Sequence, residues 1–166
     1  PAIVRRQRLS LEPMRPFIAL LCLLLAACGD DAPKPAKRMD MPQEAVVRDG
    51  DVTLRANVIL TGLLQEPMAR EYGIPRDDRS VLLMVSVREG PEGFDASLPA
   101  TITASATNLQ GQVQQIAMRE MRVGELTDYI GTADVSPPDT LRFDMKIVRE
   151  GGAASTMTFS RDFSPQ

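Results

Sequence analysis

TLRFDMKIV, residues 140–148, alternates apolar and polar side chains with a period of two. Successive side chains of a β-strand point to opposite faces, so the alternation predicts a strand that is buried on one face. The side chains expected to point inward are Leu141, Phe143, Met145 and Ile147. Arg142 and Asp144 share the outward face, where they can form an ion pair.

Other segments of strand character lie on both sides of this stretch. Residues 81–87 (VLLMVSV) predict a central strand covered on both faces. The inward face of residues 124–135 stays ambiguous, because both parities carry apolar side chains. The predicted strands are residues 51–60, 81–87, 99–107, 112–121, 124–135, 140–148 and the segment after Gly152, with 45–47 as an edge piece. About seven strands joined by turns predict an antiparallel, immunoglobulin-like β-sandwich.

One helical passage is predicted at residues 65–72. Pro67 suits the first turn of a helix, and Gly73 suits the left-handed residue that ends one. Ile74 can then fold back as the apolar contact of a Schellman-type cap. This helix is expected to be the only substantial one in the domain.

The N-terminal segment has the layout of a secretory signal. Met14-Arg15 gives a short positive region, residues 17–25 are apolar apart from Cys22, and Leu25-Ala26-Ala27-Cys28 resembles the lipobox of bacterial lipoproteins. In those proteins diacylglycerol is attached to the cysteine and the chain is cut just before it. We therefore expect residues 1–27 to be a signal peptide, in which residues 1–13 are an N-terminal overcall that precedes the true translation start at Met14. The alternative is a short buried helix in which Cys22 and Cys28 merely pack.

Cleavage before Cys28 would change the charge and the thiol content of the chain. Four arginines and one glutamate leave with residues 1–27, so the formal charge goes from −3 to −6. Residues 28–43 are expected to form a lipidated cysteine and a flexible tether with three prolines, and residues 44–166 the sandwich. The acidic balance argues against nucleic acid, and attachment to the membrane is expected through lipid on Cys28.

Five short landmarks resemble the bacterial domain of unknown function 4426 family over residues 50–163. They are Tyr72-Gly73-Ile74 with Arg76, residues 106–109 (ATNL) with Gly111-Gln112, Arg119-Glu120-Met121, Tyr129-Ile130, and residues 140–144 (TLRFD). The resemblance implies an exported, all-β, single-domain protein without an assigned activity. The chain departs from the family pattern in three ways. Residues 52–56 (VTLRA) lack the expected aromatic residues and histidine, Gln65-Glu66-Pro67 replaces a threonine-proline cap, and a lipobox precedes the domain.

Missing residue types restrict the chemistry. The sequence has no histidine, and cleavage would leave Cys28 as its one cysteine, carrying lipid. A Ser-His-Asp triad, an imidazole metal site and a cysteine nucleophile are therefore not expected, nor is any cofactor. Glu120, beside Arg119 and Arg122, is the least ordinary acid, although a cross-strand ion pair is its expected role.

The leading hypothesis is a non-enzymatic envelope lipoprotein that binds another protein or supports an assembly. Arg119, Glu120 and Asn108 are its candidate surface contacts. Gly29 follows Cys28 where inner-membrane lipoproteins commonly have aspartate, which favours the outer membrane, facing the periplasm. The partner is not specified by the sequence.

Three alternatives stay open. The first is a carrier of a small apolar ligand held in a cleft between the sheets. The second is a copper(I) carrier that uses thioethers, for which the candidate ligands are Met39, Met41, Met118 and Met121. The third is a hydrolase that uses carboxylates such as Glu120.

Overall fold

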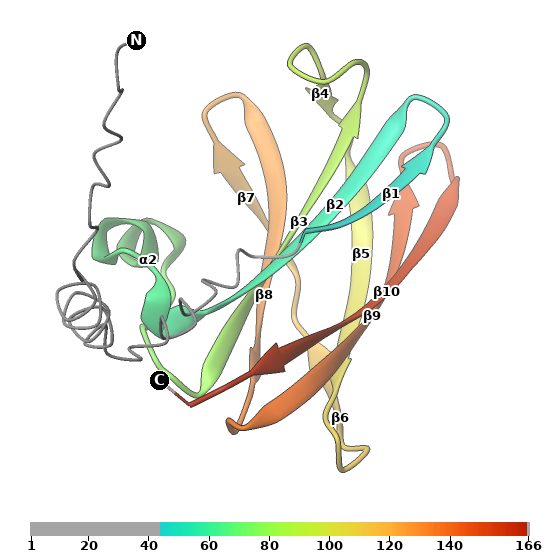
Figure 1. Ribbon diagram of the computed structural model, residues 1–166. Coiled ribbons are helices and arrows are strands. Elements are labelled where there is room, and N and C mark those ends of the chain that lie inside the picture. The colour runs from blue at the N-terminus through green and yellow to red at the C-terminus, as the bar shows by residue number, and fades with distance from the viewer. Residues whose placement is uncertain (1–43, 166) are drawn as a thin grey trace, which may run out of the picture. The chain divides into compact units, whose positions relative to one another are not determined.

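Two antiparallel sheets face each other in the computed structural model, which describes residues 44–165 (Figure 1). Sheet A has the strand order β1 (Ala45–Asp49), β2 (Val52–Leu60), β3 (Ser80–Glu89), β8 (Leu126–Asp134) and β7 (Arg119–Val123), with β4 (Ala96–Ser97) paired to β3. Sheet B has the order β10 (Ala154–Phe163), β9 (Asp139–Arg149), β5 (Ala100–Thr107) and β6 (Val113–Ile116). The predicted all-β sandwich is confirmed, with more strands in the described part of the chain than the seven expected.

Predictions for residues 1–43 lie outside the described range. They concern the signal peptide, the lipobox Leu25-Ala26-Ala27, Cys28, the tether, and the ligands Met39 and Met41. Within residues 44–165, no helix is long and apolar enough to cross a membrane.

The core lies between the two sheets, and strand parity assigns its members. On β9, the inward residues Leu141, Phe143, Met145 and Ile147 are all buried, as the alternation predicts. Phe143 stacks on Phe159 of β10, with ring centroids 5.2 Å apart. On the outward face of β9, Arg142 Nε donates to Asp144 Oδ2 at 2.9 Å, so the predicted ion pair is also confirmed.

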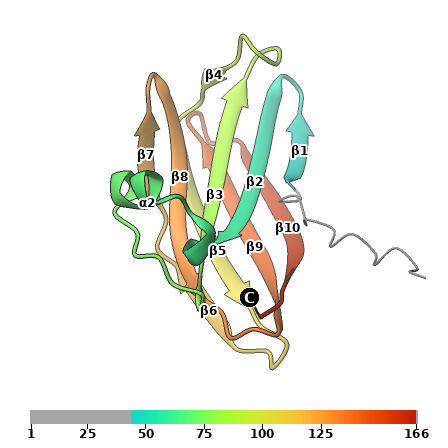
Figure 2. The same cartoon turned by 60° about the vertical axis from the view of Figure 1, so that its left-hand side comes forward.

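Strand β3 is buried on both faces, because a second apolar cluster covers the outer face of sheet A. Leu83 points into the sandwich core, whereas Leu82 packs against the helix α2 (Glu66–Tyr72). Figure 2 shows α2 lying in front of sheet A. The same arrangement resolves the ambiguity of β8, where Tyr129 belongs to the core and Ile130 to the outer cluster.

The helix ends where the sequence predicts. Gly73 has φ 63° and ψ 34°, a left-handed conformation that other residues adopt at a cost. Its N–H donates to Arg70 O at 3.1 Å, while Ile74 N–H donates to Ala69 O at 2.9 Å. These are the two bonds of a Schellman motif, and the buried side chains of Ile74 and Ala69 share the outer cluster. A short 3-10 helix, η2 (Thr61–Leu63), precedes α2.

The single strand predicted over residues 112–121 is wrong. The chain pairs with β5 as β6 in sheet B, and then crosses to sheet A as β7, where it pairs with β8. Gly131 of β8 leaves room for this crossing. A Cβ atom added there would lie 2.6 Å from Ile116 Cγ2 and 3.0 Å from Ala117 O. Only residues 117 and 118 separate the two strands.

Candidate functional site

Two of the three predicted contact residues are engaged by their own surroundings. Asn108 Oδ1 accepts from Gln112 N at 2.8 Å, so its side chain closes the β5–β6 turn. The guanidinium of Arg119 donates to Tyr72 O, a carbonyl at the C-terminal end of α2. A cation there is also favoured by the helix dipole. The contact of Arg119 with α2 is a structural role that the sequence did not predict.

Glu120 is the third predicted contact, and it lies on the edge strand β7. Its side chain is exposed, and within residues 44–165 its carboxylate forms neither a hydrogen bond nor an ion pair, so the expected cross-strand ion pair is wrong. Arg122, two residues along the strand, is also exposed and equally unpaired within that range. Two opposite charges without partners thus lie on one face of an open sheet edge.

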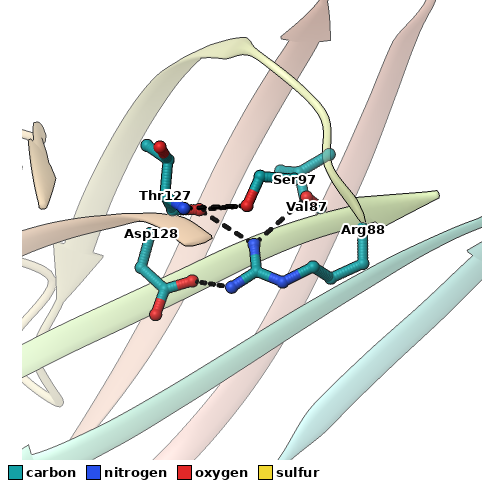
Figure 3. A network of polar contacts seen from close by, with 5 residues as sticks. All are labelled: Val87, Arg88, Ser97, Thr127 and Asp128. Carbon is teal, nitrogen blue, oxygen red and sulfur yellow. Dashed lines mark hydrogen bonds and ion pairs between the residues drawn. The ribbon is translucent and has the colours of Figure 1, made fainter. Parts of the chain in front are cut away.

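A buried polar network lies on the outer face of sheet A (Figure 3). Arg88 is only 7% exposed, and its guanidinium lies against the neighbouring strand β8. Its Nη2 pairs with Asp128 Oδ1, and Nη1 donates to Thr127 O at 2.8 Å and to Val87 O at 3.3 Å. Ser97 completes the network, because its hydroxyl accepts from Thr127 N at 2.7 Å.

This network fixes the loop between β3 and β4. Ser97 lies opposite Arg88 on β4, and it takes the place beside β3 that β8 occupies further along. The segment after β3 therefore contains a short strand, which a buried cation anchors to the sheet. The sequence did carry one signal, since Arg88 directly follows the buried apolar run that ends at Val87.

Tyr72 connects α2 to the same face of the sheet. Burial raises the pKa of its phenol above the usual 10.0, and the carboxylates of Glu71 and Asp128 raise it further. Tyr72 therefore stays protonated near neutral pH and offers no base for catalysis. Its side chain packs with Leu82 and Ile130, and this packing holds α2 against the outer face of sheet A.

A polar cleft of about 420 Å³ lies between the β1–β2 hairpin and the β3–β4 loop. Arg55 lies in its wall, where it pairs with Glu44 at 3.1 Å and Glu92 at 3.4 Å. A second hollow, of about 460 Å³, lies beside α2 and is open to solvent. Neither is lined by the residues that fill the space between the sheets. An apolar carrier would need a cavity in that space.

Metal ligands do not converge in the described part of the chain. No group of three or more His, Cys, Asp or Glu side chains there is placed to hold a metal ion. Met118 packs against the sandwich core and Met121 against the outer cluster, so sheet A separates the two thioethers. The pair predicted as part of a copper(I) site is not brought together.

Comparison with protein families gives a match to the family described as "Domain of unknown function (DUF4426)", over residues 46–165. The matched range includes residues 50–163, over which the five short landmarks resemble that family. A comparison with curated proteins gives no match.

Solved structures with a similar fold include two that are compared with this chain. A crystal structure of a DUF4426 family protein from Pseudomonas aeruginosa is 27% identical, with a TM-score of 0.63 over 74% of this chain and 96% of that chain. A copper-bound variant of FetP from uropathogenic Escherichia coli is 15% identical, with a TM-score of 0.52 over 75% of this chain and 97% of that chain. The second similarity concerns the fold alone.

Proposed function

The chain belongs to the DUF4426 family, a family of unknown function, and from this premise we propose that it is a non-enzymatic binding protein of the cell envelope. Its activity would be to hold another protein or to support an assembly. One observation carries the proposal. The edge strand β7 exposes Glu120 and Arg122, which have no partner within the described residues.

An open strand edge is suited to binding a protein. Its unpaired N–H and C=O groups are a template for another extended chain, and flanking charges select the partner. Val123 and Leu126, at the turn that closes β7 onto β8, are 43% and 39% exposed and add apolar area beside the charges. The described surface offers no comparable combination of an open edge with unpaired opposite charges.

Attachment to the membrane is the second part of the proposal. It rests on Leu25-Ala26-Ala27-Cys28 and on the change to a proline-bearing segment after Cys28. A diacylated cysteine would hold the domain at the outer membrane, facing the periplasm, since Gly29 follows Cys28. Mass spectrometry of the chain recovered from membranes should give an N-terminal Cys28 with lipid mass. Cys28→Ala should move the chain out of the membrane fraction, and an unmodified Cys28 would contradict the anchor.

Copper binding is not part of the proposal, although the FetP structure contains that metal. Copper sites in proteins use imidazole, thiolate or thioether ligands. The chain has no histidine, and Met118 and Met121 lie in separate clusters. The described residues therefore do not fit a copper site.

Crosslinking in intact cells tests the binding role. A photo-crosslinking amino acid replaces Glu120 in the full chain, and the matched control carries it at Thr103, an exposed position on the outer face of sheet B. A specific protein, which can be a second copy of this chain or another protein, should crosslink at position 120 and not at 103. Identical patterns at the two positions, or no product at position 120, would overturn the proposal.

A further inference from the structure

The free edge of β7 has a sequence that is complementary to itself. Of the described strands, only β8 pairs with β7, so the other side of β7 ends sheet A. Its sequence REMRV places Glu120 and Arg122 one residue on either side of Met121. Glu120 and Arg122 therefore share one face of the sheet, and Met121 points to the other face.

A second copy can pair with this edge through a twofold axis. If the axis passes through Met121 at right angles to the sheet, the two β7 strands run antiparallel with Met121 opposite its counterpart. Glu120 then lies opposite Arg122 of the partner subunit, and Arg122 lies opposite the partner's Glu120. Directly opposite side chains share a face and lie close, so the contact forms two ion pairs.

Other registers lack this complementarity. A shift that centres the axis on Glu120 places two glutamates opposite each other, and an axis through Arg122 places two arginines opposite each other. Like charges directly opposite are destabilising. A twofold axis in the plane of the sheet pairs side chains of opposite parity, so Glu120 no longer faces the partner's Arg122. The charges thus select one register.

We infer that the partner bound at β7 is a second copy of this chain, joined edge to edge in the register centred on Met121. The inference rests on the proposed function, because it names the partner of the same edge. The contact is isologous, so it closes as a dimer and does not continue into a fibre. Sheet A of one copy then runs on into sheet A of the other.

A cysteine at the twofold axis tests the pairing in cells. Opposite Cα atoms in an antiparallel pair lie about 4.5 to 5.5 Å apart, within the range that a disulfide bridges. The full chain carrying Met121→Cys is expressed and the cells are treated with diamide. A disulfide-linked dimer should form, beyond any product that the parent chain gives through Cys22 or Cys28.

Met84→Cys is the matched control. Met84 is also half-buried in the outer cluster, but β3 lies inside sheet A, where no second copy can pair. The two variants change the same side chain in the same way, so damage to the cluster affects both. Equal dimer yields from Met121→Cys and Met84→Cys would overturn the inference.

Charge exchange tests the register. In the Met121→Cys chain, adding Glu120→Arg or Arg122→Glu alone should lower the dimer yield by roughly tenfold, because two attractive pairs become repulsive. Combining both changes restores opposite charges across the axis and should restore the yield. Equal yields from the single and the combined exchange would overturn the register, because a structural effect of each change would not be reversed.

The outcomes separate this inference from the proposed function. If Met121→Cys gives no dimer while the photo-crosslinker at position 120 captures a different protein, the binding role stands and the self-association is wrong. If neither experiment gives a product, both are wrong.

Discussion

The Arg88–Asp128 pair gives the sharpest test of what stabilises the outer face of sheet A. The two side chains differ in exposure, at 8% for Arg88 and 21% for Asp128. Asp128→Ala therefore leaves a guanidinium buried with only the carbonyls of Thr127 and Val87 as partners. Arg88→Met leaves a carboxylate that is close enough to the surface to be hydrated. We expect Asp128→Ala to destabilise the protein more than Arg88→Met.

The magnitudes follow from the cost of an unpaired buried charge. Removing one partner of a buried pair costs about 3 kcal/mol or more, and the two remaining carbonyl contacts favour the lower figure for Asp128→Ala. Arg88→Met keeps most of the apolar packing and loses hydrogen bonds, at a cost of about 1 kcal/mol. For a domain of this size, each kcal/mol lowers the melting temperature by roughly 4 °C.

Urea unfolding monitored by circular dichroism measures both changes, and the combined variant supplies the control. When Arg88 is replaced by methionine, removing Asp128 no longer leaves a buried charge without a partner. The chain with both changes should therefore be more stable than Asp128→Ala alone. If the combined variant is the least stable of the three, or if Arg88→Met is more costly than Asp128→Ala, the account of the network is wrong.

Three further predictions concern positions that hold the fold together. Gly131→Ala should lower the free energy of unfolding, measured by urea unfolding, by about 1 to 3 kcal/mol, because its Cβ meets Ile116 and the Ala117 carbonyl. Because the pKa of the Tyr72 phenol is raised in the folded chain, the unfolded chain loses the phenol proton at a lower pH. The free energy of unfolding should therefore fall above about pH 10. In unfolding curves measured at alkaline pH, Tyr72→Phe should lessen that fall. Arg119→Met should lower the free energy of unfolding by about 1 kcal/mol and speed amide hydrogen exchange in α2. Unchanged exchange would show that Arg119 does not stabilise the C-terminal end of the helix.

The side chains that point inward on a strand could be predicted, because burial on one face produces alternating apolar and polar residues in the sequence. The alternation around Phe143 gave its inward residues correctly, and the helix end followed from Gly73 and Ile74. These are local patterns. Each depends on side-chain direction or backbone conformation within a few residues, so one segment contains the whole signal.

The crossover from β6 to β7 could not be predicted, because its cause lies in another part of the chain. Residues 112–121 contain no glycine or proline that would mark a break between two strands. The room for the crossing comes from Gly131, which lies on β8, further along the sequence. The Arg88–Asp128 pair is hidden for the same reason, since its partners are 40 residues apart.

Reassigning residues 119–123 to an edge of sheet A changes the meaning of Glu120. Inside a sheet, an acid among apolar neighbours suggests catalysis or a cross-strand pair, whereas charges on an edge usually prevent association. Prevention works when most registers bring like charges together. On β7 the registers centred on Glu120 or Arg122 do so, but the one centred on Met121 does not. The side chains that prevent indiscriminate pairing therefore permit a single partner strand, which is the property expected of a specific interface.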